Sequence, residues 1–334
     1  MKKFVIIIAV STFLALCVAG GAYLDLKAYG VRPANSSQGS KIITFHPGLT
    51  FKTATRILYQ NEIIKHPKKF ELLARIKGYD KQLKAGEYLL SSTMTPLKIL
   101  DKIVKGTVIL HKLTVPEGYN LYQIAEIVAT EGFGTEADFI KAATDPAFAR
   151  RNGIEADSLE GYLFPDTYYF RKGVSIETII TTMVDRFRSV FQEAWAHQAS
   201  NLGLSIHQVV TLASIIEKET GTAFERPLIS SVFHNRLKRK MRLETDPTVI
   251  YGLKNFDGNI TREHLETPSP YNTYKIQGLP PGPIANPGIA SIEAALHPTD
   301  TSFLYFVSKK DKTHQFSNNL TDHNRAVRKY QLNR

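Results

Sequence analysis

The sequence predicts an α+β protein that begins with a single transmembrane helix and continues into small α+β units. It ends in a mainly helical domain with ordered loops rich in proline and glycine. Residues 4–24 carry no charge and follow two lysines. Between residues 41 and 172, strand-like alternation takes turns with helix-like periodicity. From Ser175 onward apolar residues recur at helical spacing, until a run dense in proline and glycine starts at Gly278.

The N-terminal apolar segment, Phe4 to Leu24, is long enough to cross a bilayer. The lysines before it place residues 1–3 in the cytoplasm and the chain after residue 25 in the periplasm or extracytoplasmic space. We therefore expect an anchor in the cytoplasmic (inner) membrane, followed by a flexible linker at residues 25–40 that is rich in Pro, Asn and Ser. The alternative is a signal peptide that is cleaved after Gly21.

Composition limits the partners of the exported part. The only cysteine, Cys17, lies inside the apolar segment, so the rest of the chain contains neither a thiol nor a disulfide. The net charge of +11 favours anionic lipid headgroups or acidic cell-wall peptides, because an anchored extracytoplasmic domain does not meet nucleic acid.

Residues 41–108 form the first predicted unit. A strand at Lys41–Phe45, helices at Thr50–Gln60 and Pro67–Ile76, and a strand at Ala85–Leu90 precede a short helix that ends at Val104. This order resembles a LysM carbohydrate-binding module, and a plain α+β spacer is the alternative. Residues 109–172 repeat the pattern loosely as a second LysM-like or connecting unit with an insertion near residues 131–157.

The stretch Ser205–Thr220 predicts a buried helix that ends in two carboxylates, Glu217 and Glu219. At about 100° per residue they lie roughly 200° apart, so only one of them can face a given cleft. Each extends an apolar row, where burial raises a carboxyl pKa toward the range that a general acid requires. Periodicity does not choose between them, and two solvated glutamates at a helix end remain the simplest alternative.

The remaining motifs narrow the chemistry. The sequence has no HExxH or paired metal spacing, no GxSxG elbow and no nucleotide-binding glycine loop, so we expect no metal and no cofactor. Turn-rich segments after Arg242 carry aromatic and amide side chains of the kind that line saccharide clefts, although a structural loop explains them equally well. These side chains are Tyr251, Tyr271, Asn272, Tyr274 and Asn286.

Several blocks together resemble the YceG-like family of endolytic murein transglycosylases. They are "EGYLFPDTY" at 160–168, "ASIIEKET" at 213–220, "VFHNRL" at 232–237, "RLETDPTVIYG" at 242–252 and "GLPPGPIANPG" at 278–288. The resemblance covers essentially the whole chain and implies a catalytic transglycosylase domain at residues 173–334. Such a lyase cleaves the bond between N-acetylmuramic acid and N-acetylglucosamine without water. It leaves 1,6-anhydro ends and terminates strand elongation.

The resemblance also implies roles for single residues. Glu219 matches the catalytic acid/base, and Glu217, the second candidate, becomes structural, paired with Arg226 or Arg236. The residues expected to bind substrate are Asn235, Asp246, Tyr251, Tyr271, Asn272, Tyr274 and Asn286. The implied partners are peptidoglycan strands and the cell-wall synthases of elongation or division. A hydrolytic muramidase with two carboxylates and a non-enzymatic peptidoglycan-binding scaffold are the alternatives.

Overall fold

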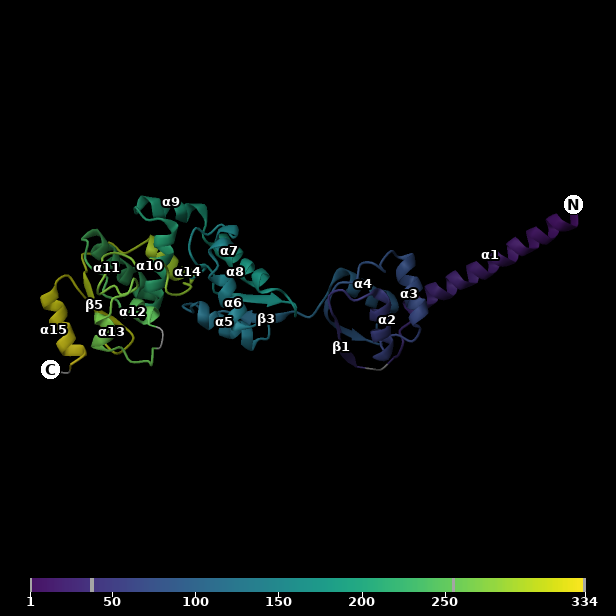
Figure 1. Cartoon of the computed structure of the whole chain (residues 1–334), viewed down its shortest axis with the longest axis horizontal. Coiled ribbons are helices and arrows are strands. Elements are labelled where there is room, and N and C mark those ends of the chain that lie inside the picture. Colours follow the sequence, from purple (N-terminus) through teal and green to yellow (C-terminus); the bar gives the residue numbers. More distant parts are fainter. Residues whose placement is uncertain (1, 37–38, 254–255, 333–334) are drawn as a thin grey trace. The chain divides into compact units, whose positions relative to one another are not determined.

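The computed structural model describes residues 2–36, 39–253 and 256–332, and the chain divides into two compact units (Figure 1). Unit 1 contains the chain up to His111 together with Tyr169–Gly173. Unit 2 contains Lys112–Tyr168 and the chain from Val174 onward. The boundary that we predicted between residues 172 and 173 does not separate compact units, because residues 112–168 belong with the C-terminal part.

Unit 1 begins with the helix α1, Lys2–Val31, which extends seven residues past the predicted span. Mean hydropathy in its most apolar window is 2.5, and it is the one unbroken helix in the described chain that is long and apolar enough to cross a membrane. The predicted linker at 25–40 is therefore wrong for residues 25–31, while residues 37–38 lie outside the described part. Leu26 is buried, and a Cβ at Gly30 would lie 3.2 Å from Leu97 Cγ. Leu26 and Gly30 are four residues apart and therefore lie on the same face of the helix, which packs against the rest of unit 1. The amino-acid composition of the segment does not reveal this packing.

The rest of unit 1 follows the predicted order of strand, helix, helix, strand and helix. Strands β1 and β2 are antiparallel, with Ile43 opposite Tyr88, and aromatic side chains such as Phe45 and Phe70 fill the core beneath them. The elements are β1 (Ser40–Phe45), α2 (Phe51–Gln60), α3 (Pro67–Ile76), β2 (Gly86–Ser91) and α4 (Pro96–Lys105).

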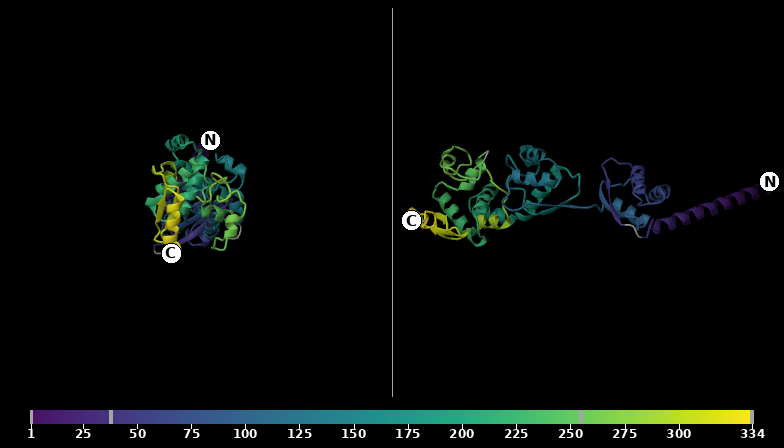
Figure 2. Two further views of the ribbon diagram at one scale, coloured as in Figure 1. Left: turned by 90° about the vertical axis from the view of Figure 1, so that its left-hand side faces the viewer. Right: turned by 90° about the horizontal axis from the view of Figure 1, so that it is seen from below.

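Unit 2 is built around α10 (Ile206–Glu219), which packs against α11 (Arg226–Lys238) and α14 (Ile289–Leu296). The strands β5 (Tyr305–Ser308) and β6 (His314–Ser317) pair within unit 2. The strands β3 (His111–Thr114) and β4 (Thr167–Phe170) also pair, and the residues of both strands are divided between the two units. The β5–β6 hairpin lies against α15 (Leu320–Tyr330) at the C-terminal end of the unit (Figure 2). The other helices are α5 (Leu121–Thr130), α6 (Glu136–Ala143), α7 (Pro146–Arg151), α8 (Ile176–Val190), α9 (Glu193–Asn201), η1 (Ala223–Glu225), α12 (Asp246–Gly252) and α13 (Arg262–Glu266).

Candidate active site

The helix α10 holds both candidate carboxylates in its last turn. Ser205 starts the helix with a capping box, in which its hydroxyl accepts from Gln208 N while the Gln208 side chain accepts from Ser205 N. All eight residues from Val209 to Ile216 are buried, so α10 is a fixed support. It ends at Glu219 because Thr220 adopts an extended backbone conformation (φ −90°, ψ 117°).

Glu219 is partly buried, and its carboxylate accepts a hydrogen bond from the Thr245 hydroxyl. The pKa of Glu219 is raised to about 7, chiefly by burial, and the negative charge of Asp246 contributes to this rise. The Thr245 hydrogen bond and the nearby His314 act in the opposite direction on this pKa and do not offset burial. A carboxyl group with this pKa is protonated in a large fraction of molecules at neutral pH, as a general acid must be.

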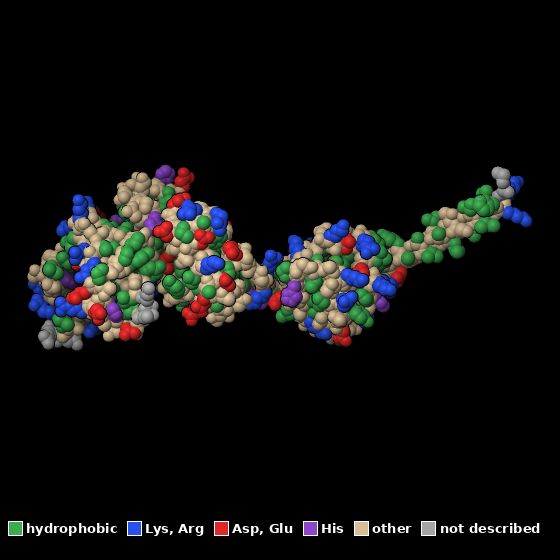
Figure 3. Space-filling model, viewed as in Figure 1, with side chains coloured by type: hydrophobic (Ala, Val, Ile, Leu, Met, Phe, Trp, Pro, Cys, Tyr) green, Lys and Arg blue, Asp and Glu red, His purple; other side chains and the backbone are tan. Residues whose placement is uncertain are grey.

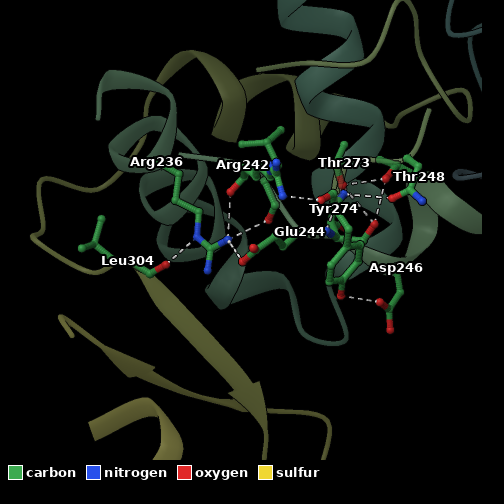
Figure 4. A network of polar contacts seen from close by, with 11 residues as sticks. Arg236, Arg242, Glu244, Asp246, Thr248, Thr273, Tyr274 and Leu304 are labelled. Carbon is green, nitrogen blue, oxygen red and sulfur yellow. Dashed lines mark hydrogen bonds and ion pairs between the residues drawn. The ribbon is translucent and has the colours of Figure 1, made fainter. Parts of the chain in front are cut away.

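The segment around Thr245, which donates to Glu219, is held by a network of hydroxyl groups that includes Thr248 and Thr273 (Figure 4). The Thr273 hydroxyl accepts from Thr245 N at 3.0 Å and lies 2.9 Å from the Thr248 hydroxyl. The Tyr274 hydroxyl donates to Asp246 Oδ1 at 2.7 Å, which fixes that carboxylate at the start of α12. These hydrogen bonds therefore hold the segment around Thr273 and the first turn of α12 in fixed positions relative to each other.

A buried arginine, Arg236, stabilises the turn at residues 242–244 that precedes α12. Arg236 on α11 donates from Nη1 to the carbonyl oxygens of Arg242 and Leu243 at 3.0 and 3.1 Å, and to Glu244 Oε2 at 3.0 Å (Figure 4). Its Nε donates to the Leu304 carbonyl at 2.7 Å. Because Glu244 has a positive φ of 51°, the turn needs such support to persist.

Glu217 has a different environment. Its carboxylate accepts from the backbone N–H of Gly288 at 3.0 Å and pairs with Arg226 Nη2 at 3.5 Å. Only 8% of its side chain is exposed. Gly288 is the N-cap of α14, so Glu217 ties α10 to the start of α14. The neighbouring Glu117 has a raised pKa because it is partly buried and close to Glu217.

Another buried carboxyl group, which sequence reasoning missed, belongs to Glu160. It is 2% exposed and accepts from Leu121 N at 3.1 Å, from the Tyr251 hydroxyl at 3.1 Å and from Asn286 Nδ2 at 3.0 Å. Burial raises its pKa to about 7 against the effect of these donors. The Tyr271 ring lies 4.9 Å from that of Tyr251, so this aromatic pair adjoins Glu160. The only available signal was an acidic residue directly before the aromatic and apolar run at residues 161–165.

With this geometry in place, comparison with known proteins decides the family. The family model described as the YceG-like family matches residues 43–329. The chain belongs to the YceG-like family. It is 36% identical over 329 residues to the endolytic murein transglycosylase of Bacillus subtilis (strain 168), a match that covers 94% of this chain and 91% of that protein.

Other relatives agree with this family membership. The endolytic murein transglycosylase of Streptococcus pneumoniae (strain R6) is 31% identical over 369 residues, and the match covers 98% of this chain but 65% of that longer protein. A crystal structure of a YceG-like protein from Listeria monocytogenes matches with a TM-score of 0.60 at 37% identity, covering 86% of this chain and 99% of that one. The predicted resemblance is thereby confirmed.

The predicted substrate-binding residues of this YceG-like chain lie in three places. Asp246 and Tyr274 lie with Glu219, whereas Tyr251, Tyr271 and Asn286 gather around Glu160. Two amides instead hold loops together. Asn235 Nδ2 donates to the carbonyls of Thr301 and Phe303 at 2.8 and 3.0 Å. The fully buried Asn272 donates to the carbonyls of His264, Leu265 and Thr267.

The described residues contain no cluster of three His, Cys, Asp or Glu side chains that could hold a metal ion. A hollow of about 690 Å³ beside Asn235 and one of about 540 Å³ beside His207 are both lined without Glu219. The volume of a hollow therefore does not identify the active site. The burial and raised pKa of the Glu219 carboxyl group identify it as the candidate.

Proposed function

We propose that this YceG-like chain is a membrane-anchored lytic transglycosylase that cuts peptidoglycan strands internally. The observation that carries the proposal is Glu219, a partly buried carboxyl group with a pKa of about 7 at the end of a rigid helix. Relatives named endolytic murein transglycosylase support the same activity. The apolar helix α1 supports the membrane anchor.

In the proposed reaction Glu219 acts first as an acid and then as a base. Its carboxyl group donates a proton to the oxygen between N-acetylmuramic acid and N-acetylglucosamine, and the bond from the muramoyl C1 to that oxygen breaks. The muramoyl C6 hydroxyl then attacks C1 and returns its proton to Glu219. The products are a 1,6-anhydro end and a free N-acetylglucosamine end, and no water is consumed. One carboxyl group that can exist in both protonation states near pH 7 meets this requirement.

We assign Asp246 the role of stabilising the positive charge that develops on the sugar in the transition state. The Tyr274 hydroxyl keeps its carboxylate in place at 2.7 Å, and its charge acts on Glu219. A fixed negative charge stabilises an oxocarbenium-like transition state without forming a bond to it. We assign the aromatic pair Tyr251 and Tyr271 to stacking on a neighbouring sugar, because Tyr251 lies at the other end of α12 from Asp246 and the Tyr271 ring lies 4.9 Å from it.

The position of Asp246 also favours one competing reaction, which is hydrolysis of the same bond with two carboxyl groups. A hydrolase needs a second carboxylate to activate water or to form a glycosyl intermediate, and Asp246 is the acidic residue whose charge acts on Glu219. Hydrolysis leaves reducing ends that are one water heavier than anhydro ends, so mass spectrometry of the products separates the two reactions.

The decisive experiment compares Glu219→Gln with Glu193→Gln, an exposed glutamate on α9 whose side chain is 91% exposed. Purified peptidoglycan is digested with each full-length protein, and the products are separated and weighed. We expect anhydro ends from wild type and from Glu193→Gln, and at least a hundredfold lower rate from Glu219→Gln. A wild-type rate in Glu219→Gln, or reducing ends only, would refute the proposal.

We further propose that the N-terminus is cytoplasmic and that the chain after α1 lies outside the cytoplasm, where nascent strands and their synthases are found. The lysines before α1 support this orientation. The order β1, α2, α3, β2 in unit 1 supports a LysM-like module that contacts glycan. Glycan pull-down by the full chain, with and without substitutions in unit 1, tests that role.

A further inference from the structure

The membrane helix of this protein continues without a break into its folded unit 1. The helical residues Asp25–Val31 lie beyond the predicted span, and at about 1.5 Å per residue they cover about 10 Å. Headgroups extend a bilayer from about 30 Å of hydrocarbon to about 40–45 Å, or several ångströms on each side. The first turn of this part of α1 therefore lies at the depth of the lipid headgroups, and its last residues lie at the outer edge of the headgroup layer.

Four kinds of contact fix the start of α3 beside this end of α1. Lys69 Nζ pairs with Asp25 Oδ2 at 2.6 Å. The Tyr29 hydroxyl donates to the His66 carbonyl at 3.3 Å, and the two rings meet edge to face at 5.9 Å. The buried Leu26 adds apolar packing. The segment that carries Lys65, His66, Lys68 and Lys69 is thus held beside the headgroup layer by contacts within unit 1.

A basic hollow of about 210 Å³ lies at this junction. Arg32 and Lys65 line it, are exposed, and form no ion pair with any described residue. The one acidic side chain in its lining, Asp25, is already paired with Lys69. Figure 3 shows Lys and Arg side chains on unit 1 near the end of α1, whose own surface is mostly apolar. Two cations are therefore left for an anion from outside the chain.

We propose that this hollow binds the phosphodiester headgroup of an anionic phospholipid in the leaflet where α1 leaves the membrane. Arg32 offers a planar fork to two phosphate oxygens, and Lys65 offers a mobile ammonium group. The apolar residues of α1 that precede Asp25 contact the acyl chains of the same lipid. Bound in this way, the lipid sets the tilt of unit 1 on the membrane. The inference rests on the proposed membrane anchor and is independent of glycan cleavage.

The test uses the full chain in detergent and native mass spectrometry with added phosphatidylglycerol or phosphatidylcholine. The variant is Arg32→Gln with Lys65→Gln. The matched control is Lys52→Gln with Arg56→Gln on α2, which removes the same charges from exposed residues outside the hollow. We expect the wild type and the control to retain phosphatidylglycerol over phosphatidylcholine, and the variant to lose about tenfold or more of that affinity.

Three results would overturn the proposal. They are equal retention of both lipids by the wild type, equal losses in the variant and the control, and displacement of the lipid by millimolar inorganic phosphate, which would mark a site for free anions. Peptidoglycan cleavage is measured on the same samples and is expected to be unchanged in both pairs. If the wild type fails to cleave, the proposed function fails while the lipid result still stands.

Discussion

Replacing Glu219 by glutamine should remove activity and also stabilise the protein at alkaline pH. The reason is that Glu219 must give up hydration in the folded state, so its pKa rises from 4.5 to about 7. Below pH 4.5 the group is mostly neutral in the folded and unfolded chains. As the pH rises from 4.5 to 7, only the unfolded chain ionises, so the folded state loses stability. Above pH 7 the loss is complete.

The size of this effect follows from the two pKa values. A difference of about 2.5 pH units corresponds to about 3 kcal/mol at roughly 1.36 kcal/mol per unit. Part of it has already appeared at pH 5, and the side chain is partly exposed, so about 2 kcal/mol remains between pH 5 and pH 8. Glutamine carries no charge at either pH and still accepts from the Thr245 hydroxyl. Glu219→Gln should therefore gain about 2 kcal/mol over wild type on going from pH 5 to pH 8.

The assay is thermal unfolding of wild type, Glu219→Gln and the exposed control Glu193→Gln at both pH values. For a unit of this size, about 2 kcal/mol corresponds to about 4–8 °C in Tm. Glu160 also has a raised pKa, but it is present in all three proteins and cancels in the comparison. The same difference from wild type at pH 5 and pH 8 would refute the raised pKa, and with it the physical basis for assigning the acid to Glu219.

Three further substitutions test the supports of the site. Glu160→Gln should lose about 2–3 kcal/mol in urea unfolding, because its amide N–H₂ would face groups that already donate; unchanged stability would contradict this hydrogen-bond pattern. Gly161→Ala should lose at least about 2 kcal/mol, since Gly161 has a φ of +87° and the new Cβ would lie 2.5 Å from Pro283 Cβ; wild-type unfolding would contradict it. Asn235→Ala should lose about 1–3 kcal/mol and keep its cleavage rate within about twofold; a large rate loss in folded protein would return Asn235 to the substrate site.

Strongly periodic segments of the fold could be predicted from the sequence. The structure places α3 at Pro67–Ile76, as predicted, and α10 within one residue of the predicted Ser205–Thr220. Helix caps and apolar periodicity depend only on residues close together in the sequence, so they predict a helix without knowledge of the tertiary structure. The linker prediction failed because Leu26 and Gly30 gain their meaning only from the surface against which they pack.

The site was harder to predict for the same reason. Glu217 and Glu219 both extend apolar rows, and what distinguishes them is Arg226, 9 residues from Glu217, and Thr245, 26 residues from Glu219. The choice of Glu219 as the acid came from the family resemblance and stays a prediction. Glu160 gathers Tyr251 and Asn286 from 91 and 126 residues away, contacts that no periodicity encodes.

The two carboxyl groups with a pKa of about 7 can be told apart by what their ionisation affects. Helix α12 places Asp246 near Glu219 and Tyr251 against Glu160, about five residues or 7–8 Å apart. Glu160 is 2% exposed and surrounded by donors, so its ionisation alters folding but transfers no proton to a sugar. Glu219 is partly open, so its ionisation alters both folding and proton transfer. The fall in cleavage rate above pH 7 should therefore follow Glu219 alone, whereas the fall in stability from pH 5 to pH 8 should be the sum of both groups.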